Sequence, residues 1–187
     1  MLSRGAFRAQ LVVQGQRTLF DYWLVAAGSR QMPARSDIDP QGVTKLLPHI
    51  GLIDVANGLE EARFRLAGTK LHDVYGREIT GQRLGQVFSG GQADYWHRAH
   101  QRVLETGAPH HGVVRGPAEG RDHIVLFWLR LPLSQDGLCV DRILCLDVAA
   151  PVETVKAAIV PPQRRYAPAL VPVPVKVAAE PHQIHYS

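Results

Sequence analysis

The sequence predicts a single domain of the α+β class. Two strand-like segments precede a series of short helical segments and one longer helix, and three more strand-like segments follow. The last two of these are apolar on both faces at their centres, which implies cover on both sides of a sheet. Of the 187 residues, 45% are hydrophobic and 20% are charged, which is ordinary for one globular core.

The first expected element is a helix over residues 15–27. Thr18 is its expected cap and Gly28 its expected stop. One face carries an apolar stripe made of Leu19, Tyr22, Trp23 and Ala26. This stripe must be buried against its own domain or against a second subunit, and both alternatives stay open.

A short helix is expected next, because Asp37-Ile-Asp-Pro40 offers an N-cap followed by a proline, and Pro48 should end it. Residues 50–55 and 63–67 are then β-prone and flank Asn57-Gly58, which predicts a hairpin with a loop longer than two residues. In its second strand Phe64 and Leu66 should share a face, because strand side chains alternate.

Helical patterns fill the middle of the chain. Thr69 can cap one or two turns that Gly76 ends, and residues 92–106 form an amphipathic helix. Three strands should follow at residues 110–115, 123–133 and 142–149. The helix over residues 15–27 is the expected cover for the second face of their sheet.

Both ends of the chain are assigned separately from the domain. Residues 1–14 are expected to be an N-terminal extension, residues 15–150 the domain, and residues 151–187 a flexible tail with seven of the thirteen prolines. The alternative for the tail is a docking segment, in which alternate valines of Val171-Pro-Val-Pro-Val175 occupy pockets on a partner.

Composition argues against several classes of function. The net charge is +4, but arginines alternate with acids, so no basic face for nucleic acid is expected. Cys139 and Cys145 fall on one expected strand about 20 Å apart, which is too far for a disulfide and fits a reducing compartment. There is no secretory apolar region and no apolar run of membrane-spanning length, so we predict a cytoplasmic protein without a membrane span.

No catalytic or metal site is expected either. The chain has no Gly-x-Ser-x-Gly, no phosphate-binding loop and no His-Glu-x-x-His. His97 and His100 lie three apart on an expected helix, but the sequence fixes no third ligand. His110 and His111 are adjacent in a strand and should point to opposite faces.

Aromatic and polar side chains of the expected helices and strands are candidates for a small-molecule pocket, because such pockets combine aromatic walls with a few placed polar groups. Core filling is the alternative role of these residues. The candidate ligand-binding residues are Phe64, Leu66, Tyr75, Phe88, Trp96, His100, Leu126 and Trp128.

Several segments are similar in amino-acid sequence to one known family: Leu19-Phe-Asp-Tyr-Trp-Leu24, Met32-Pro, Asp37-Ile-Asp-Pro40, Leu46-Leu-Pro48, Arg63-Phe-Arg-Leu-Ala-Gly-Thr69 and Tyr75-Gly-Arg-Glu-Ile-Thr-Gly81. Together they resemble the PAS-like family of short alphaproteobacterial proteins with one such domain. The order of the expected elements also looks like that of a PAS domain. The similarity covers about residues 16–150 and does not reach the tail.

The resemblance implies a five-stranded antiparallel sheet with short helices on one face and an N-terminal helix. It also implies a pocket that holds a small molecule or nothing, and a homodimer formed through the stripe Leu19, Tyr22, Trp23 and Ala26. It identifies no cofactor. The resulting hypothesis is a non-catalytic sensory module that binds a small ligand or a partner protein and relays through protein contact. The alternatives are a constitutive structural adaptor without a ligand and, more remotely, a small enzyme.

Overall fold

Five strands form one antiparallel sheet in the order β2-β1-β5-β4-β3. The computed structural model describes residues 3–154 of the chain. All four neighbouring pairs of strands are antiparallel, which confirms the predicted α+β class and the five-stranded sheet. The strands are β1 (Ile50–Asp54), β2 (Arg63–Ala67), β3 (His110–Arg115), β4 (Ile124–Leu133) and β5 (Arg142–Pro151).

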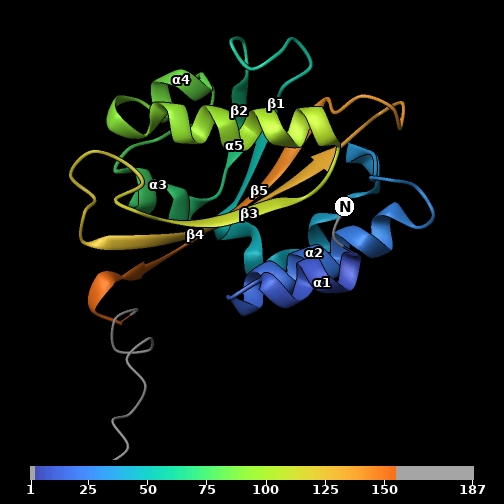
Figure 1. The fold of residues 1–187 in the computed structure, drawn as a ribbon, viewed down its shortest axis with the longest axis horizontal. Coiled ribbons are helices and arrows are strands. Elements are labelled where there is room, and N and C mark those ends of the chain that lie inside the picture. Colours follow the sequence, from blue (N-terminus) through green and yellow to red (C-terminus); the bar gives the residue numbers. More distant parts are fainter. Residues whose placement is uncertain (1–2, 155–187) are drawn as a thin grey trace, which may run out of the picture.

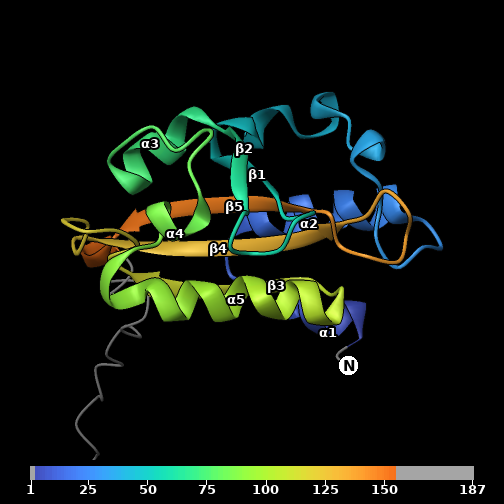
Figure 2. The ribbon, with the colours of Figure 1, turned by 90° about the horizontal axis from the view of Figure 1, so that it is seen from above.

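Helices cover both faces of this sheet. Figure 1 shows α4 and α5 above the sheet and α1 and α2 below it, and in Figure 2 α2 lies behind the strands. The helical elements are α1 (Arg4–Gln10), α2 (Gln14–Ala27), η1 (Arg35–Asp37), η2 (Pro40–His49), α3 (Thr69–Tyr75), α4 (Leu84–Val87), η3 (Gly90–Gln92) and α5 (Ala93–Thr106). Within residues 3–154, no helix is both long and apolar enough to cross a bilayer.

The alternation of β4 explains why both faces need cover. Leu129, Leu131 and Leu133 point into a core shared with α2, whereas Leu126 and Trp128 point into a second core under α5. The prediction of a sheet covered on both sides is therefore confirmed.

The apolar stripe of α2 packs on its own sheet. Leu19 is 0% exposed and Trp23 is 2% exposed, and the Trp23 Nε1–H donates a hydrogen bond of 2.9 Å to the carbonyl of Pro132. Tyr22 exchanges hydrogen bonds with the backbone of Asp39, and Ala26 packs against the same core. Leu19 and Trp23 are therefore buried within the domain, and a homodimer formed through the stripe stays a prediction.

The N-terminal region differs from the expectation in two ways. Helix α2 begins at Gln14, where Val13 is the N-cap and its N–H donates to the Gln16 side chain, so Thr18 lies inside the helix and does not cap it. Residues 3–14 include α1, and Leu11 is fully buried. This segment therefore packs on the domain. The predicted tail lies outside the described residues, apart from residues 151–154.

A bulge in the first hairpin overturns one expected pairing. Ile53 pairs with Phe64 and Leu52 pairs with Leu66, so Arg65 is an extra residue on β2. Side chains on the two sides of the bulge then point to opposite faces. Phe64 is fully buried in the α5-side core, whereas Leu66 is 44% exposed, and the prediction that the two share a face is wrong.

The cysteines are not joined in the structure. Cys139 is exposed and precedes β5, and Cys145 is buried within β5. The expectation that both lie on one strand is therefore wrong for Cys139, because the turn before β5 extends past it.

Replacing Trp23 with Ala is expected to lower the free energy of unfolding by about 3–5 kcal/mol, because a fully packed ring leaves a cavity that the core cannot fill. Urea denaturation of the full chain, followed by circular dichroism, measures this loss. Val25→Ala is the matched control on the same helix, since Val25 is 82% exposed, and should change stability by less than about 0.5 kcal/mol. A Trp23→Ala protein with unchanged stability but a smaller mass by light scattering would show that the stripe is an intersubunit contact.

Candidate functional site

A buried ion pair joins the neighbouring strands β4 and β5 on the α5 side of the sheet. Arg130 of β4 and Asp147 of β5 are both 0% exposed. Trp128 is opposite Asp147 and Cys145 is opposite Arg130, so the two charged residues are diagonal neighbours across the strands. Their contacts are bidentate, with Nη1 2.7 Å from Oδ1 and Nη2 3.3 Å from Oδ2.

Tyr75 adds a second donor to the carboxylate. Its hydroxyl lies at the end of α3 and donates a hydrogen bond of 2.8 Å to Asp147 Oδ2. Burial, and then the negative charge of Asp147, raises the pKa of Tyr75 well above its usual value. The phenol therefore stays protonated, and the carboxylate is held by an arginine and a tyrosine together.

His100 of α5 completes the network from the other side. Its Nδ1 lies 2.7 Å from the carbonyl of Trp96, and its Nε2 lies 3.2 Å from Nε of Arg130. A carbonyl accepts and a guanidinium donates, so these partners assign the proton to Nδ1 and leave Nε2 as the acceptor. Burial, and then the charge of Arg130, lowers the pKa of His100 to about 3, so the ring is neutral near pH 7.

Aromatic rings surround the guanidinium. Its central carbon lies 5.2 Å from the centre of the Trp96 ring and 5.5 Å from that of Trp128, within the range of cation–π attraction. Phe88 stacks on Trp96 with ring centres 4.4 Å apart. Gly112 lies opposite Trp128 on β3, and a Cβ atom there would come within 2.6 Å of the indole. A glycine is therefore needed for Trp128 to lie across the edge strand.

Most of the residues predicted to bind a ligand do come together. Six belong to the α5-side core, and His100 contacts two of them, Phe88 and Trp96. The six are Phe64, Tyr75, Phe88, Trp96, Leu126 and Trp128. Leu66 is not with them, because of the bulge. The seven side chains pack on one another, so core filling describes their present arrangement, and their role toward a ligand remains a prediction.

Two residues at the centre of the site were missed from the sequence. Arg130 is the only charge in the apolar strand β4, and Asp147 is the only charge in β5 beyond its first residue. Single opposite charges in two neighbouring buried strands could have pointed to an ion pair, because an unpaired buried charge is too costly to persist.

One polar atom of the site has no partner in the described part of the chain. The Nε1–H of Trp96 is buried and makes no hydrogen bond there. Trp96 also lines a cleft of about 390 Å³ between α4 and α5, together with Phe88, Asp94 and His97. The indole thus lies at the border between the buried network and a surface cleft.

His97 and His100, which lie three residues apart on α5, have different surroundings. His97 lines the cleft, whereas His100 lies in the interior. In residues 3–154, no group of three His, Cys, Asp or Glu side chains has the geometry to hold a metal ion.

A five-stranded antiparallel sheet covered by short helices and one long helix places the domain in the α+β class. The chain belongs to the PAS domain family, because a family model described as a PAS domain matches residues 12–146. This confirms the resemblance to PAS domains. No curated protein matches the chain.

Solved structures of the same fold are distant. A LOV protein from Rhodobacter sphaeroides is 16% identical with a TM-score of 0.47, and the match covers 65% of this chain and 74% of that one. A sensory box sensor histidine kinase from Vibrio cholerae is 15% identical with a TM-score of 0.41, covering 58% and 86%. A PAS domain from Colwellia psychrerythraea is 9% identical with a TM-score of 0.45, covering 59% and 96%.

Breaking the buried ion pair is expected to cost more than removing it. Asp147→Leu leaves Arg130 charged and unpaired and should lower the free energy of unfolding by about 3–5 kcal/mol, whereas adding Arg130→Met should restore most of the loss. Urea denaturation of the single and double variants gives the coupling energy directly. Asp73→Ala removes the exposed pair with Lys70 as a control and should change stability little. Additive losses in the double variant would contradict a paired buried charge.

The neutral state of His100 predicts a pH dependence. Its pKa in the folded protein lies below the ordinary value of about 6.5, so the unfolded chain binds the proton more readily. The contribution to stability is complete above about pH 6.5 and is lost as the pH falls toward 3, amounting to about 2–3 kcal/mol between about pH 7 and about pH 4.5.

His100→Gln replaces the imidazole with an amide, which still offers one hydrogen-bond donor and one acceptor but cannot be protonated in this pH range. Its stability should therefore fall less over the same interval, as measured by urea denaturation at both pH values. His72→Gln is the matched control, since His72 is 61% exposed, and should follow the wild type. Equal losses in wild type and His100→Gln would rule out this source of acid sensitivity.

Proposed function

We propose that this chain is a non-catalytic PAS-type sensory module that takes up a small ligand beside Trp96 and relays its state by contact with a partner protein. Membership of the PAS family supports the class of signalling module. The observation that carries the proposal is the fully buried network of Arg130, Asp147, Tyr75 and His100 between α5 and the sheet.

A buried ion pair is a costly way to stabilise a core. Hydrophobic side chains of similar volume often replace a buried ion pair without loss, so its presence favours a role other than packing. Ionisable groups with strongly shifted pKa values also concentrate at functional sites. The pKa of His100 is lowered and that of Tyr75 is raised within one connected set of hydrogen bonds.

Trp96 supports the position of the ligand. Its free Nε1–H favours a ligand atom that accepts a hydrogen bond, and the stacked Phe88 and Trp96 rings favour a flat apolar body. The neighbouring cleft of about 390 Å³ lies within the range of small-molecule sites.

The same residue offers a route for the signal. The carbonyl of Trp96 accepts the hydrogen bond from His100, whose other nitrogen accepts from Arg130. A ligand that moves Trp96 would therefore change the contacts between α5 and β4. A tenfold difference in affinity between two such states corresponds to about 1.4 kcal/mol, which is enough to shift a balanced equilibrium.

A constitutive structural adaptor is the second candidate function. It is favoured by the mutual packing of the seven predicted pocket residues, which fill the space they were expected to surround. In that case the network would only fix the fold, and partners would bind to a surface whose shape does not change.

Native mass spectrometry of the purified full chain separates these two functions. The sensory proposal predicts a copurified small molecule that is present in the native spectrum and absent under denaturing conditions. Trp96→Phe removes the free N–H, and the fraction of protein that carries the small molecule should fall at least tenfold relative to the wild type. Trp23→Phe makes the same chemical change on the opposite face of the sheet and should keep it. A native mass equal to that of the polypeptide would reject the sensory proposal in favour of the adaptor.

A further inference from the structure

A second cleft lies where the N-terminal helices meet the edge of the sheet. It has a volume of about 600 Å³ and is lined by residues of α1, α2, the end of α5 and the beginning of β3. Figure 1 places these four elements on the same side of the molecule. The cleft curves around β3, which is an edge strand, so the adjacent residues His110 and His111 both line it although they face opposite sides of the sheet.

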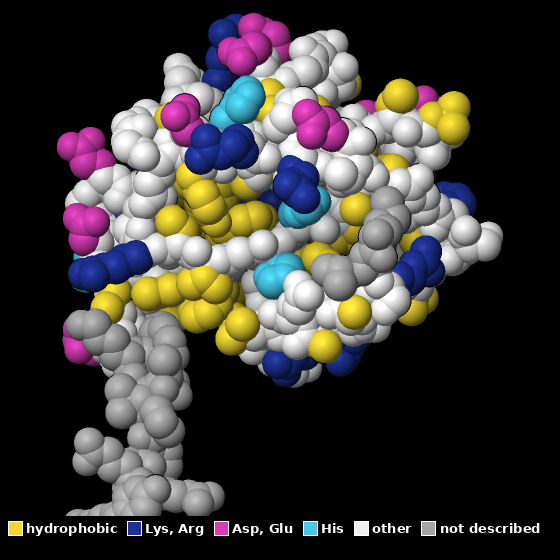
Figure 3. Space-filling view, in the orientation of Figure 1, with side chains coloured by type: hydrophobic (Ala, Val, Ile, Leu, Met, Phe, Trp, Pro, Cys, Tyr) yellow, Lys and Arg dark blue, Asp and Glu magenta, His cyan; other side chains and the backbone are white. Residues whose placement is uncertain are grey.

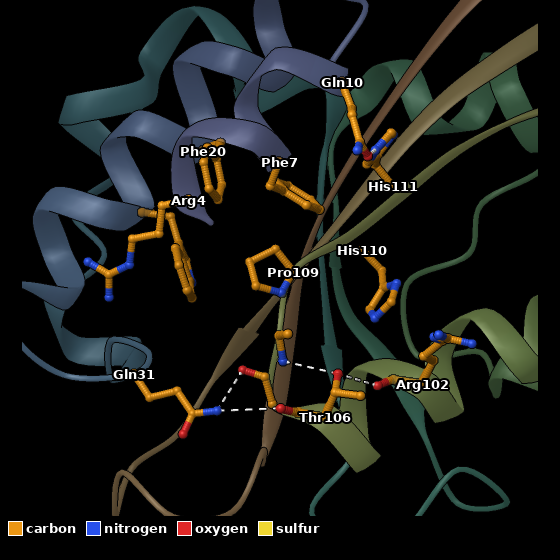
Figure 4. Close-up of a pocket in the computed structure, with 13 residues that line it drawn as sticks. Arg4, Phe7, Gln10, Phe20, Gln31, Arg102, Thr106, Pro109, His110 and His111 are labelled. Atoms are coloured by element: carbon orange, nitrogen blue, oxygen red, sulfur yellow. Dashed lines mark hydrogen bonds between the residues drawn. The ribbon is translucent and has the colours of Figure 1, made fainter. Parts of the chain in front are cut away.

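One wall of the cleft is aromatic. Phe7 and Phe20 lie with ring centres 4.9 Å apart, and Trp23 stacks on Phe20 at 6.1 Å. Pro109 faces Phe7 across the cavity in Figure 4. These side chains form an apolar slot that suits a flat ring.

The charged side chains that line the cleft are all positive, and Arg4 and Arg102 lie at opposite ends of it in Figure 4. Arg4 and Arg102 line the cleft, and no Asp or Glu does. Arg4 donates a hydrogen bond to the carbonyl of Arg30, but the guanidinium of Arg102 makes no hydrogen bond or ion pair with any described residue. Figure 3 shows the same combination on this face, where hydrophobic side chains lie next to histidines and to Lys or Arg.

His110 lies beside Arg102 in Figure 4, and its imidazole also has no hydrogen-bond partner among the described residues. Burial, and then the charge of Arg102, lowers the pKa of His110. A neutral imidazole keeps one N–H donor, so Arg102 and His110 offer charge and a directed hydrogen bond at the same end of the cleft. His111, in contrast, is already bonded to Gln10.

We propose that this cleft is a binding site for a small aromatic carboxylate. Its ring lies in the slot between Phe7, Phe20 and Pro109, and its carboxylate lies against Arg102 and His110. The guanidinium pairs with a carboxylate through two parallel hydrogen bonds, which selects an anion over a neutral molecule of the same shape. This site is separate from the interior site beside Trp96, so the chain would bind two ligands.

Binding there would tie the N-terminal helices to the rest of the domain. Gln31, which follows α2, already donates to the carbonyls of Thr106 and Gly107 at the end of α5, as Figure 4 shows. A ligand between α1 and Arg102 adds a second link across the same junction. Amide hydrogen exchange in residues 4–10 should therefore slow when the site is filled.

Isothermal titration calorimetry of the full chain with 2-naphthoate tests the proposal, with 2-naphthamide and 2-naphthylmethylamine as neutral and cationic probes of the same shape. The naphthoate is expected to bind at least tenfold more tightly than the amide, and the amine is expected to bind more weakly than either. Backbone amide resonances of residues 106–108 and 110–111 should shift with the naphthoate.

Arg102→Gln should remove the preference for naphthoate over naphthamide. Arg98→Gln, which changes an exposed arginine one turn earlier on the same helix, should keep it. Trp96→Phe should also keep it, which distinguishes this site from the interior one. Equal affinities for naphthoate and naphthamide in the wild type, or no heat of binding for any probe, would overturn the proposal without bearing on the interior site.

Discussion

The salt bridge between Arg130 and Asp147 is the constraint on which the α5 side of the domain depends. Each charge would be far too costly to bury alone, so the carboxylate must be held by every donor within reach and the guanidinium by every acceptor. Tyr75 and His100 supply these contacts from α3 and α5. The two helices are therefore fixed to the sheet by hydrogen bonds of defined direction as well as by apolar packing.

The same strand that carries Arg130 also determines the other face. Because side chains alternate along β4, burying Arg130 and Trp128 under α5 places Leu129 and Leu131 on the opposite face of the sheet. These leucines need cover of their own, and α2 provides it with Leu19 and Trp23. The N-terminal helices are thus a structural requirement of a strand that is buried on both faces.

Much of the fold could be predicted from the sequence because its signals are local. The strand boundaries of β1 to β4 and the helix α5 followed from periodicity and from glycines at their ends. Leu66 could not be placed, because the bulge at Arg65 depends on pairing with β1. Thr18 has a side chain that commonly caps helices, but α2 begins one turn earlier, at Gln14. Its cap is Val13, whose backbone N–H donates to the side chain of Gln16. The role of the stripe on α2 was undetermined because periodicity shows which face is apolar and not what covers it.

The candidate site divides in the same way. Its aromatic members could be identified, since buried aromatic residues gather in one core, but the charged centre depends on the register of two strands that are joined only after folding. That register also connects the two candidate sites. His110, which lines the cleft beside the N-terminal helices, is directly opposite Arg130 in the pairing of β3 with β4. Helix α5 carries both His100 and Arg102. A ligand at either site would act on the same helix and the same strand pair, so coupling between the sites requires no long pathway, only two positions of α5 against β4 that the ligands bind with unequal affinity.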